Sequence, residues 1–247
     1  MKVDSLLDRL SGALFAPRCL LCGLPGQLPC LDLCPACEHG LQLLPQPACQ
    51  RCALPVDAGC SSPVCEACER TPPPFERCIA AFRYSFPVDA MVRDLKYRGR
   101  LPIARVLGEL LARSMLSQNL HSDLDLLLPV PLHPLRHADR GFNQSAEIAR
   151  WCARRLGRPL ELSAARRIRA TAPQAALSRI DRRENLRRAF AVDPRVRGRR
   201  LAIVDDVVTS GSTVRELSSA LLAAGAEIVV VCCVARTVDG ARDATSA

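Results

Sequence analysis

Two adjacent carboxylates, Asp205 and Asp206, stand just before a turn of small hydroxyl residues and one glycine. Carboxylate oxygens accept hydrogen bonds from the vicinal hydroxyl groups of a ribose, and they also help to hold a hydrated Mg²⁺. A glycine turn that enters a helix presents free backbone N–H groups and the positive end of the helix dipole, which suits a phosphate. The residues of this turn are Thr209, Ser210, Gly211, Ser212 and Thr213. Together the two features predict a site for a phosphorylated ribose.

The elements around these residues would bring them together. Residues 201–204 are a short apolar run that predicts a strand buried on both faces, with the carboxylates at its carboxyl end. Thr213 and Glu216 fit a capping box that opens the next helix. Because ligands of open α/β sheets bind outside the carboxyl ends of the strands, we expect the acids and the turn to border one hollow. The competing interpretation is that these side chains only cap and solvate the turn.

The N-terminal part of the chain is rich in cysteine. Ten of the 14 cysteines lie between positions 19 and 68, and eight form the Cys-x-x-Cys pairs Cys19/Cys22, Cys34/Cys37, Cys49/Cys52 and Cys65/Cys68. Two pairs complete a tetrahedron of thiolates around one Zn²⁺, so the spacing predicts two structural zinc sites. Disulfides would need an exported protein, which nothing in the sequence marks, and paired knuckles favour zinc over an iron–sulfur cluster. Cys30 and Cys60 are left over, and we expect them to pack as small apolar residues.

A proline-rich segment after residues 124–130 carries several cations and predicts a rigid loop. Arg136 and Arg140 present planar guanidinium groups that match phosphate oxygens, so we expect them to contact a pyrophosphate group. For His133 and His137 two roles are equally favoured: contact with the phosphate groups, or a structural role as turn residues bonded to the backbone.

The hydrophobic pattern divides the chain into a small N-terminal module and one α/β domain with a parallel sheet flanked by helices. The expected strands are 78–84, 124–130, 201–204 and 227–234, and the expected helices are 87–97, 101–120, 144–156 behind the cap residue Asn143, and 214–224. The expected boundaries are 1–18 for an amphipathic helix, 19–71 for a double zinc ribbon, 72–77 for a Pro-rich linker, 78–238 for the domain and 239–247 for a tail. Cys232 and Cys233 should lie in the core on opposite faces of a strand.

Charge and hydropathy narrow the function classes. The net charge is +9, and it is uneven: residues 1–78 hold 6 Lys and Arg against 8 Asp and Glu, and the rest hold 28 against 17. The excess is greatest in residues 136–200, with 18 Arg and 6 acids, which favours a polyanionic ligand such as pyrophosphate or nucleic acid. No apolar run reaches the ~20 residues of a membrane span, and the N-terminus does not resemble a signal peptide. We therefore expect a cytoplasmic protein.

Several segments resemble the ComF competence-protein family, bacterial proteins with a phosphoribosyltransferase-like domain behind an N-terminal zinc ribbon. The segments are the four cysteine pairs, Val130-Pro131-Leu132 leading to Arg140-Gly141-Phe142-Asn143-Gln144, Thr171-x-x-Gln174 with Asn185, and residues 203–213. Residues 203–213 are also similar to the phosphoribosyl-pyrophosphate (PRPP) motif of type I phosphoribosyltransferases, with Ser210 where that motif often has Thr. The resemblance implies the type I phosphoribosyltransferase fold.

The resemblance also implies roles for single residues. Asp205 and Asp206 would be the catalytic pair that holds the ribose hydroxyls, residues 209–213 would bind the 5′-phosphate of PRPP with Mg²⁺, and residues 132–140 would face the pyrophosphate. Residues 166–185 would form a flexible hood over the ligand, and this hood is a candidate nucleic-acid contact. Its candidate residues are Arg169, Gln174, Arg179, Arg183 and Asn185.

Two functions follow as hypotheses. In the first, the chain is a PRPP-dependent phosphoribosyltransferase that acts in DNA uptake and natural transformation, with an acceptor that no residue identifies. In the second, it is an accessory protein that binds single-stranded DNA, works with other proteins of the competence machinery and keeps a vestigial PRPP site. A housekeeping enzyme of nucleotide salvage is a third interpretation, for which the hood offers no base-specific residue.

Overall fold

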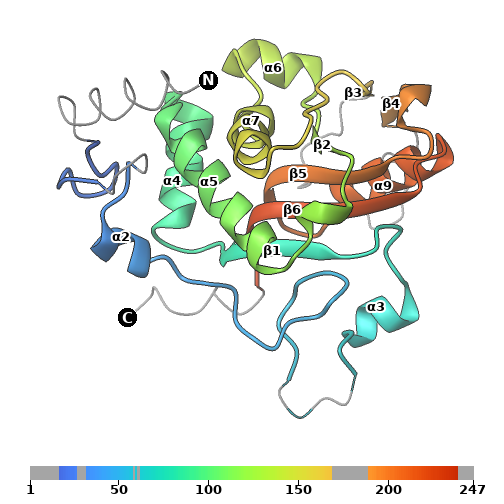
Figure 1. The fold of residues 1–247 in the computed structure, drawn as a ribbon, viewed down its shortest axis with the longest axis horizontal. Coiled ribbons are helices and arrows are strands. Elements are labelled where there is room, and N and C mark those ends of the chain that lie inside the picture. Colours follow the sequence, from blue (N-terminus) through green and yellow to red (C-terminus); the bar gives the residue numbers. More distant parts are fainter. Residues whose placement is uncertain (1–16, 27–31, 58, 60–61, 169–188, 239–247) are drawn as a thin grey trace.

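The computed structural model describes residues 17–26, 32–57, 59, 62–168 and 189–238. Their centre is a four-stranded sheet in which all neighbouring strands are parallel, in the order β1-β6-β5-β2. The strands are β1 (Cys78–Arg83), β2 (Leu126–Pro129), β5 (Arg200–Val208) and β6 (Ile228–Arg236). Since parallel strands need crossover connections, helices lie between them in the sequence and cover both faces of the sheet (Figure 1). The expected α/β fold is confirmed.

The two central strands are buried on both faces, which explains their almost uninterrupted apolar sequences. One face packs against α4 (Val88–Arg98), α5 (Pro102–Ser117) and α7 (Gln144–Leu156), and the other packs against α9 (Ser212–Ala223). Cys232 belongs to the first core cluster and Cys233 to the second, and both side chains are fully buried. Their predicted placement on opposite faces of one strand is therefore confirmed.

Local signals end and begin the helices as expected. Gly99 follows α4 in the left-handed conformation with φ 62°, where a residue with a side chain would be strained. Asn143 caps α7, because its Oδ1 accepts hydrogen bonds from the amides of Ser145 at 3.0 Å and Ala146 at 3.4 Å. A short 3₁₀ helix, η1 (His121–Asp123), leads from α5 to β2.

Three local predictions are wrong. The rigid loop after β2 contains a helix, α6 (Pro134–Arg140), because Pro134 suits the first helical turn and the His133 ring accepts a hydrogen bond from the Leu135 amide. The expected strand 201–204 continues to Val208, so the acid pair lies inside β5. The capping box is also wrong, since α9 begins one residue before Thr213 and its N-cap is Gly211, without a side-chain cap.

A second, two-stranded sheet was not predicted. The strands β3 (Ala165–Arg167) and β4 (Phe190–Val192) pair antiparallel, and a 3₁₀ helix, η3 (Pro194–Val196), follows them. Strand β3 overlaps the start of the expected hood, residues 166–185, and residues 169–185 of that hood lie outside the described part of the chain. The pairing was hard to foresee because three-residue strands are too short to show an alternating pattern.

The cysteine-rich module packs against the domain on two sides. It contains two short helices, α2 (Pro35–His39) and α3 (Glu66–Arg70). The Arg113 guanidinium on α5 forms an ion pair with Glu38 of α2 at 2.8 Å, and Cys19 and Leu33 join the core cluster beneath α5. On the other side, Phe75 and Ala53 join the core cluster beneath α9. The module therefore shares its apolar interior with the domain.

The predicted helix in residues 1–18 falls almost wholly in residues 1–16, and the predicted tail is residues 239–247; both lie outside the described ranges, as do Cys30 and Cys60. Within the described ranges, no helix has the length and apolar character needed to cross a membrane.

Candidate functional site

The acid pair lies at the carboxyl end of β5, next to the N-terminus of α7. Ser145 Oγ donates a hydrogen bond to Asp205 Oδ1 at 3.0 Å, and Gln144 Nε2 donates to Asp206 Oδ1 at 3.1 Å. The backbone amide of Asp206 also donates to Asp205 Oδ1 at 3.0 Å. Both carboxylates are buried, with 9% of Asp205 and 3% of Asp206 exposed. Each acid is thus held in place by its own residue of α7.

Burial changes the acidity of Asp205. Loss of water around the carboxylate, followed by repulsion from Asp206, raises the pKa of Asp205 to about 8, against the opposing hydrogen bond from Ser145. Asp205 therefore binds a proton near neutral pH, when no ligand is present. A positively charged or hydroxyl-bearing ligand would favour its ionised, hydrogen-bond-accepting form.

Asp206 has a cationic partner. Lys96, near the end of α4, forms an ion pair with Asp206 Oδ2, and its side chain is 21% exposed. Its position was predicted only as a favourable charge at a helix C-terminus. The scarcity of lysine is a better signal for Lys96, because the whole chain has just two lysines among its 34 basic residues. A flexible ammonium in an otherwise arginine-rich chain suits a partner that must be exchanged for a ligand.

Arg140 reaches the same network from α6. Its Nη1 donates a hydrogen bond to Gln144 Oε1, whose amide nitrogen in turn contacts Asp206. The Arg140 guanidinium also lies over the Tyr97 ring, 5.6 Å from its centroid. Arg140 is therefore connected to the acid pair through Gln144, and its expected contact with a pyrophosphate stays a prediction.

The hydroxyl turn lies directly beside Asp205. A hollow of about 50 Å³ is lined by Asp205, Val207, Val208 and residues 209–214. Gly211 has φ 76°, which lets the chain reverse into α9, and Ser210 Oγ lies 3.0 Å from Ser212 Oγ. The N-cap Gly211 gives the 12-residue α9 no side-chain cap, and the first amide of the helix, that of Ser212, donates a hydrogen bond to Ser210 Oγ at 3.4 Å. The fold thus brings Asp205 and the turn to one hollow, whereas Asp206 faces α4 and α7.

Two arginines outside the lining of this hollow interact electrostatically, and one of them also interacts with Asp205. Arg136 of α6 is exposed, and Arg167 at the end of β3 is partly buried. Burial and then repulsion from Arg136 lower the pKa of Arg167, while attraction to Asp205 opposes the shift. Arg167 therefore belongs to the electrostatic surroundings of both Arg136 and the acid pair. The candidate hood residues Arg169, Gln174, Arg179, Arg183 and Asn185 lie outside the described residues.

A wider cavity of about 640 Å³ opens at the carboxyl end of β2. Its walls come from the start of α6, the first turns of α7 and strand β3. The lining is mixed, with Leu132 and Phe142 among the apolar residues and Arg150, Arg166 and Arg167 among the charged ones. Because β2 pairs with β5 at Pro129 and Val204, this cavity lies one strand away from the acid pair.

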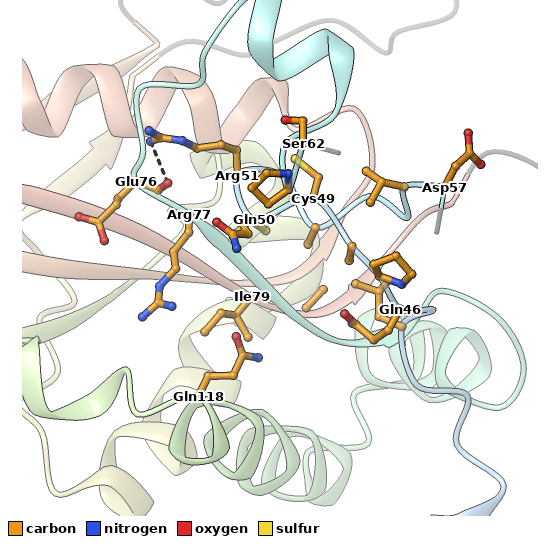
Figure 2. A pocket seen from close by; sticks show the side chains of 18 residues that line it. Gln46, Cys49, Gln50, Arg51, Asp57, Ser62, Glu76, Arg77, Ile79 and Gln118 are labelled. Carbon is orange, nitrogen blue, oxygen red and sulfur yellow. Dashed lines mark hydrogen bonds between the residues drawn. The ribbon is translucent and has the colours of Figure 1, made fainter. Parts of the chain in front are cut away.

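Another cavity, of about 970 Å³, separates the second cysteine cluster from β1. Figure 2 shows Gln46 and Gln50 on the cysteine-rich side, Arg77 on the domain side, and Gln118 at the end of α5. The Arg51 guanidinium closes part of it by donating to the Glu76 carbonyl at 3.0 Å (Figure 2). This cavity does not include the acid pair or the turn.

The eight paired cysteines form two groups of four, as predicted. One group is Cys19, Cys22, Cys34 and Cys37, and the other is Cys49, Cys52, Cys65 and Cys68. Within each group the sulfur atoms lie within 4.8 Å of one another, and single contacts such as Cys22 Sγ to Cys34 Sγ measure 3.6 Å. Four thiolates bound tetrahedrally to zinc at 2.3 Å would be about 3.8 Å apart, so the geometry fits this metal.

The acidity of the thiols also fits a metal. Burial opposes the ionisation of Cys19, but hydrogen bonds from the backbone of Cys34 and Cys22 outweigh it and lower the pKa of Cys19 to about 6. Cys49 of the second group behaves alike, with a pKa of about 7. In contrast, contact with Cys22, together with burial, raises the pKa of Cys37 to about 12. Each group therefore contains one cysteine with a lowered pKa, and a bound cation would favour ionisation of those whose pKa is raised.

Comparison with known families agrees with both halves of the structure. The model of the double zinc ribbon domain matches residues 10–69, and that of the phosphoribosyl transferase domain matches residues 143–245. The two cysteine groups are therefore the structural zinc sites of a double zinc ribbon, and the parallel sheet belongs to the phosphoribosyltransferase type.

Full-length relatives share both halves. The DNA utilization protein YhgH of Salmonella typhi is 38% identical over 222 residues, which cover 89% of this chain and 96% of that protein. Competence protein F of Haemophilus influenzae is 29% identical over 225 residues, with the same two coverages. A solved structure, the glutamine PRPP amidotransferase from B. subtilis with ADP and GMP, aligns at a TM-score of 0.36 and 26% identity over 52% of this chain and 25% of that chain. On the strength of the near full-length relatives, this chain belongs to the ComF family, which joins a double zinc ribbon to a phosphoribosyltransferase domain.

Proposed function

We propose that this protein binds PRPP with Mg²⁺ at the carboxyl end of β5 and transfers or senses its phosphoribosyl group during DNA uptake. The observation that carries the proposal is the hollow shared by Asp205 and residues 209–213. Amides at the start of α9 and the hydroxyl groups of the turn would hold the 5′-phosphate, since a helix N-terminus attracts an anion. The neighbouring carboxylates would accept hydrogen bonds from the ribose hydroxyls.

The acid pair has a further task in transfer. As the pyrophosphate leaves, positive charge develops on the sugar, and a nearby carboxylate stabilises that charge. Asp205 is protonated near neutral pH in the empty site, so binding of Mg²⁺ with its polyanionic substrate would favour release of that proton. Gln144 and Ser145 keep both carboxylates oriented throughout, because each donates a hydrogen bond to one of them.

The leaving pyrophosphate needs cations on the opposite side of the ribose. Arg136 and Arg167 supply a positive field there, and the repulsion between them favours a polyanion that neutralises both. Lys96 is bound to Asp206 in the empty site and would exchange that partner for ligand oxygens. The cavity of about 640 Å³ at the end of β2 offers room for the acceptor.

A role in DNA uptake is supported by the names of the relatives, a DNA utilization protein and a competence protein. Residues 136–200, with 18 Arg and 6 acids, favour a second candidate function, the binding of single-stranded DNA by an accessory protein of the competence machinery. With aromatic residues at 4% of the chain, that binding would be electrostatic more than it would depend on stacking.

Calorimetric titration of the full-length protein with PRPP and MgCl₂ tests the proposal. We expect saturable binding to the wild type and its loss in the double variant Asp205→Asn/Asp206→Asn. The matched control is Asp123→Asn, an exposed carboxylate in η1 at the opposite end of β2, which should bind like the wild type. Equal binding by the double variant and the wild type would contradict the assignment of the site.

The second candidate is tested on the same proteins with a fluorescent oligothymidine. Its affinity should fall steeply with salt, because each phosphate contact releases a counterion. If the double variant keeps full oligonucleotide affinity and full transformation in cells while losing PRPP, the accessory function is favoured over catalysis.

A further inference from the structure

Arg236, the last residue of β6, is a buried arginine with an unusual set of partners. Only 4% of the residue is exposed. Its Nε donates to the Cys52 carbonyl at 3.1 Å, and its Nη1 donates to the carbonyls of Val208 at 2.8 Å and Thr237 at 3.2 Å. Nη1 also donates to the Thr209 carbonyl. The described part of the chain places no carboxylate within ion-pairing distance of this guanidinium.

These partners belong to two different sites. Cys52 is a ligand residue of the second zinc site, and Val208 and Thr209 begin the turn that lines the candidate phosphate hollow. The two sites are far apart in the sequence, since 184 positions separate Arg236 from Cys52 but only 28 separate it from Val208. One side chain therefore ties the metal module to the ligand turn.

The zinc site gives a reason for a buried cation at this place. A buried charge without a counter-ion is costly, and backbone carbonyls offset only part of that cost. Zinc bound by four thiolates has a formal charge of −2, so the filled second site supplies a negative charge next to Arg236. The filled site therefore favours the guanidinium in its buried position.

The contact on the other side fixes the backbone of the turn. In a trans peptide unit the carbonyl and the following N–H point in opposite directions. Because Arg236 binds the carbonyls of Val208 and Thr209, the amides of Thr209 and Ser210 point away from it. Release of Arg236 would leave the Thr209 carbonyl without this partner, whereas the Val208 carbonyl would keep the hydrogen bond from the Thr237 amide at 3.1 Å.

We propose that Arg236 is a positioning residue that couples zinc in the second cysteine group to the geometry and anion affinity of residues 208–213. The anion part of this inference rests on the proposed function, whereas the coupling of zinc to the turn does not. The first cysteine group has no such connection within the described residues, which provides an internal control.

The test uses hydrogen exchange of the full-length protein at residues 208–213. Cys65→Ala removes a ligand of the second zinc site, and Cys37→Ala removes a ligand of the first. We expect Cys65→Ala to speed exchange in the turn about tenfold and Cys37→Ala to leave it within about twofold of the wild type. Equal effects of the two variants, or no effect of Cys65→Ala, would overturn the coupling.

Arg236→Met distinguishes coupling from simple loss of structure. In Arg236→Met the amide hydrogens of residues 208–213 should already exchange fast. Adding Cys65→Ala to this variant should not increase their exchange rate further. Fully additive effects would mean that Arg236 and the zinc act separately and would refute the proposal. Arg236→Lys keeps the charge but cannot bridge both sites, so it should resemble Arg236→Met.

Ribose 5-phosphate provides the anion readout, and Cys65→Ala should weaken its binding about tenfold more than Cys37→Ala does. By reciprocity, saturating ribose 5-phosphate should slow the release of one zinc from the wild type but not from Arg236→Met. A wild type that binds neither ribose 5-phosphate nor PRPP would refute the proposed function, while hydrogen exchange alone would still decide the coupling.

If Cys65→Ala does not fold, zinc release to a chromogenic chelator replaces the experiments on this variant. Arg236→Met must then release one zinc faster than the wild type, and equal rates overturn the proposal.

Discussion

At the scale of single residues, two identical side chains next to each other have acquired different surroundings. Asp205 borders the hollow of the turn and has its pKa raised to about 8, mainly by burial. Asp206 is more deeply buried but has the ammonium of Lys96 as its partner. Neighbouring residues of a strand point to opposite faces, and here both carboxylates contact the N-terminus of α7 but only Asp205 lines the hollow. The acid pair therefore works as one protonated and one ion-paired carboxyl group.

The pKa of Asp205 predicts how stability depends on pH. An unfolded aspartate ionises near pH 4, whereas folded Asp205 keeps its proton to about pH 8. Between these values the folded state binds the extra proton, so the contribution of Asp205 to stability falls as the pH rises, by at most about 1.4 kcal/mol for each pH unit. We expect Asp205→Asn to gain thermal stability relative to the wild type from pH 5 to pH 8.

Melting curves at pH 4, 5, 6, 7, 8 and 9 check this prediction. The difference in Tm between Asp205→Asn and the wild type should widen up to about pH 8 and then stay constant. Asp123→Asn, which changes an exposed carboxylate, is the control for the loss of a negative charge. A constant Tm difference over the whole range would show that folding does not shift the pKa of Asp205.

At the scale of elements, the unit β5–turn–α9 decides what the site can bind. The strand presents Asp205, the turn reverses the chain at Gly211, and the helix begins without a side-chain cap from its N-cap residue. A glycine is needed at position 211 for its φ of 76°, and not for space, because an added Cβ would meet only Val208 Cγ1 at an ordinary 3.8 Å. Sequence alone places this glycine correctly, because the motif itself requires the turn.

Gly211→Ala therefore tests the turn without adding bulk. A left-handed residue with a side chain costs about 1–2 kcal/mol, so the free energy of unfolding should fall by about that amount. Relaxation of the turn should also weaken the binding of ribose 5-phosphate about tenfold, measured by calorimetry alongside urea unfolding.

Gly157→Ala is the matched control. Gly157 ends α7 with φ 64°, and no atom lies within 4 Å of an added Cβ. It should lose similar stability and keep its affinity for ribose 5-phosphate. If both variants lose affinity equally, the effect is general destabilisation and the turn has no special role.

At the scale of the molecule, the zinc ribbons are part of the folded core. Cys19, Leu33 and Cys34 pack in the same cluster as the helices beneath the sheet, while Leu44, Ala53 and Phe75 pack in the cluster on the other face. Arg236 adds a buried hydrogen bond between the second ribbon and the sheet. Removal of zinc should therefore destabilise the domain as well as the cysteine-rich module.

The purified protein should contain two zinc ions per chain, and Cys37→Ala should contain one. Chelation should lower the Tm of the whole chain by about 10 °C in a single transition, because structural zinc contributes several kcal/mol to folding. Elemental analysis and differential scanning calorimetry measure the two quantities.

Cys152→Ala is the control for loss of a cysteine, since Cys152 is buried in the core and belongs to neither zinc group. It should keep two zinc ions. A chelated protein in which the ribbons unfold separately, with an unchanged transition for the domain, would contradict a shared core.

The sequence by itself determined those features in which neighbouring residues carry the whole signal. The cysteine pairs gave the two zinc groups, the apolar runs gave the parallel strands, and Asn143 and Gly99 marked helix ends through contacts within a few residues. The acid pair with its turn is of the same kind. Local chemistry was sufficient because the helix ends and the turn depend on contacts within a few residues, and the two cysteine pairs of each zinc group lie within about a dozen residues of each other.

Only the tertiary structure decided which distant residues complete the site. Lys96, Gln144, Ser145 and Arg236 come from three different elements, and none of them is marked by its own neighbours as a partner of the acid pair or the turn. The helix α6 and the antiparallel strands β3 and β4 were missed, because short elements are stabilised by packing more than by their own pattern. The order of the strands determines where their carboxyl ends lie. The packing of the helices over the sheet determines which side chains meet at those ends. Because burial there excludes water, the acids have only these side chains as partners.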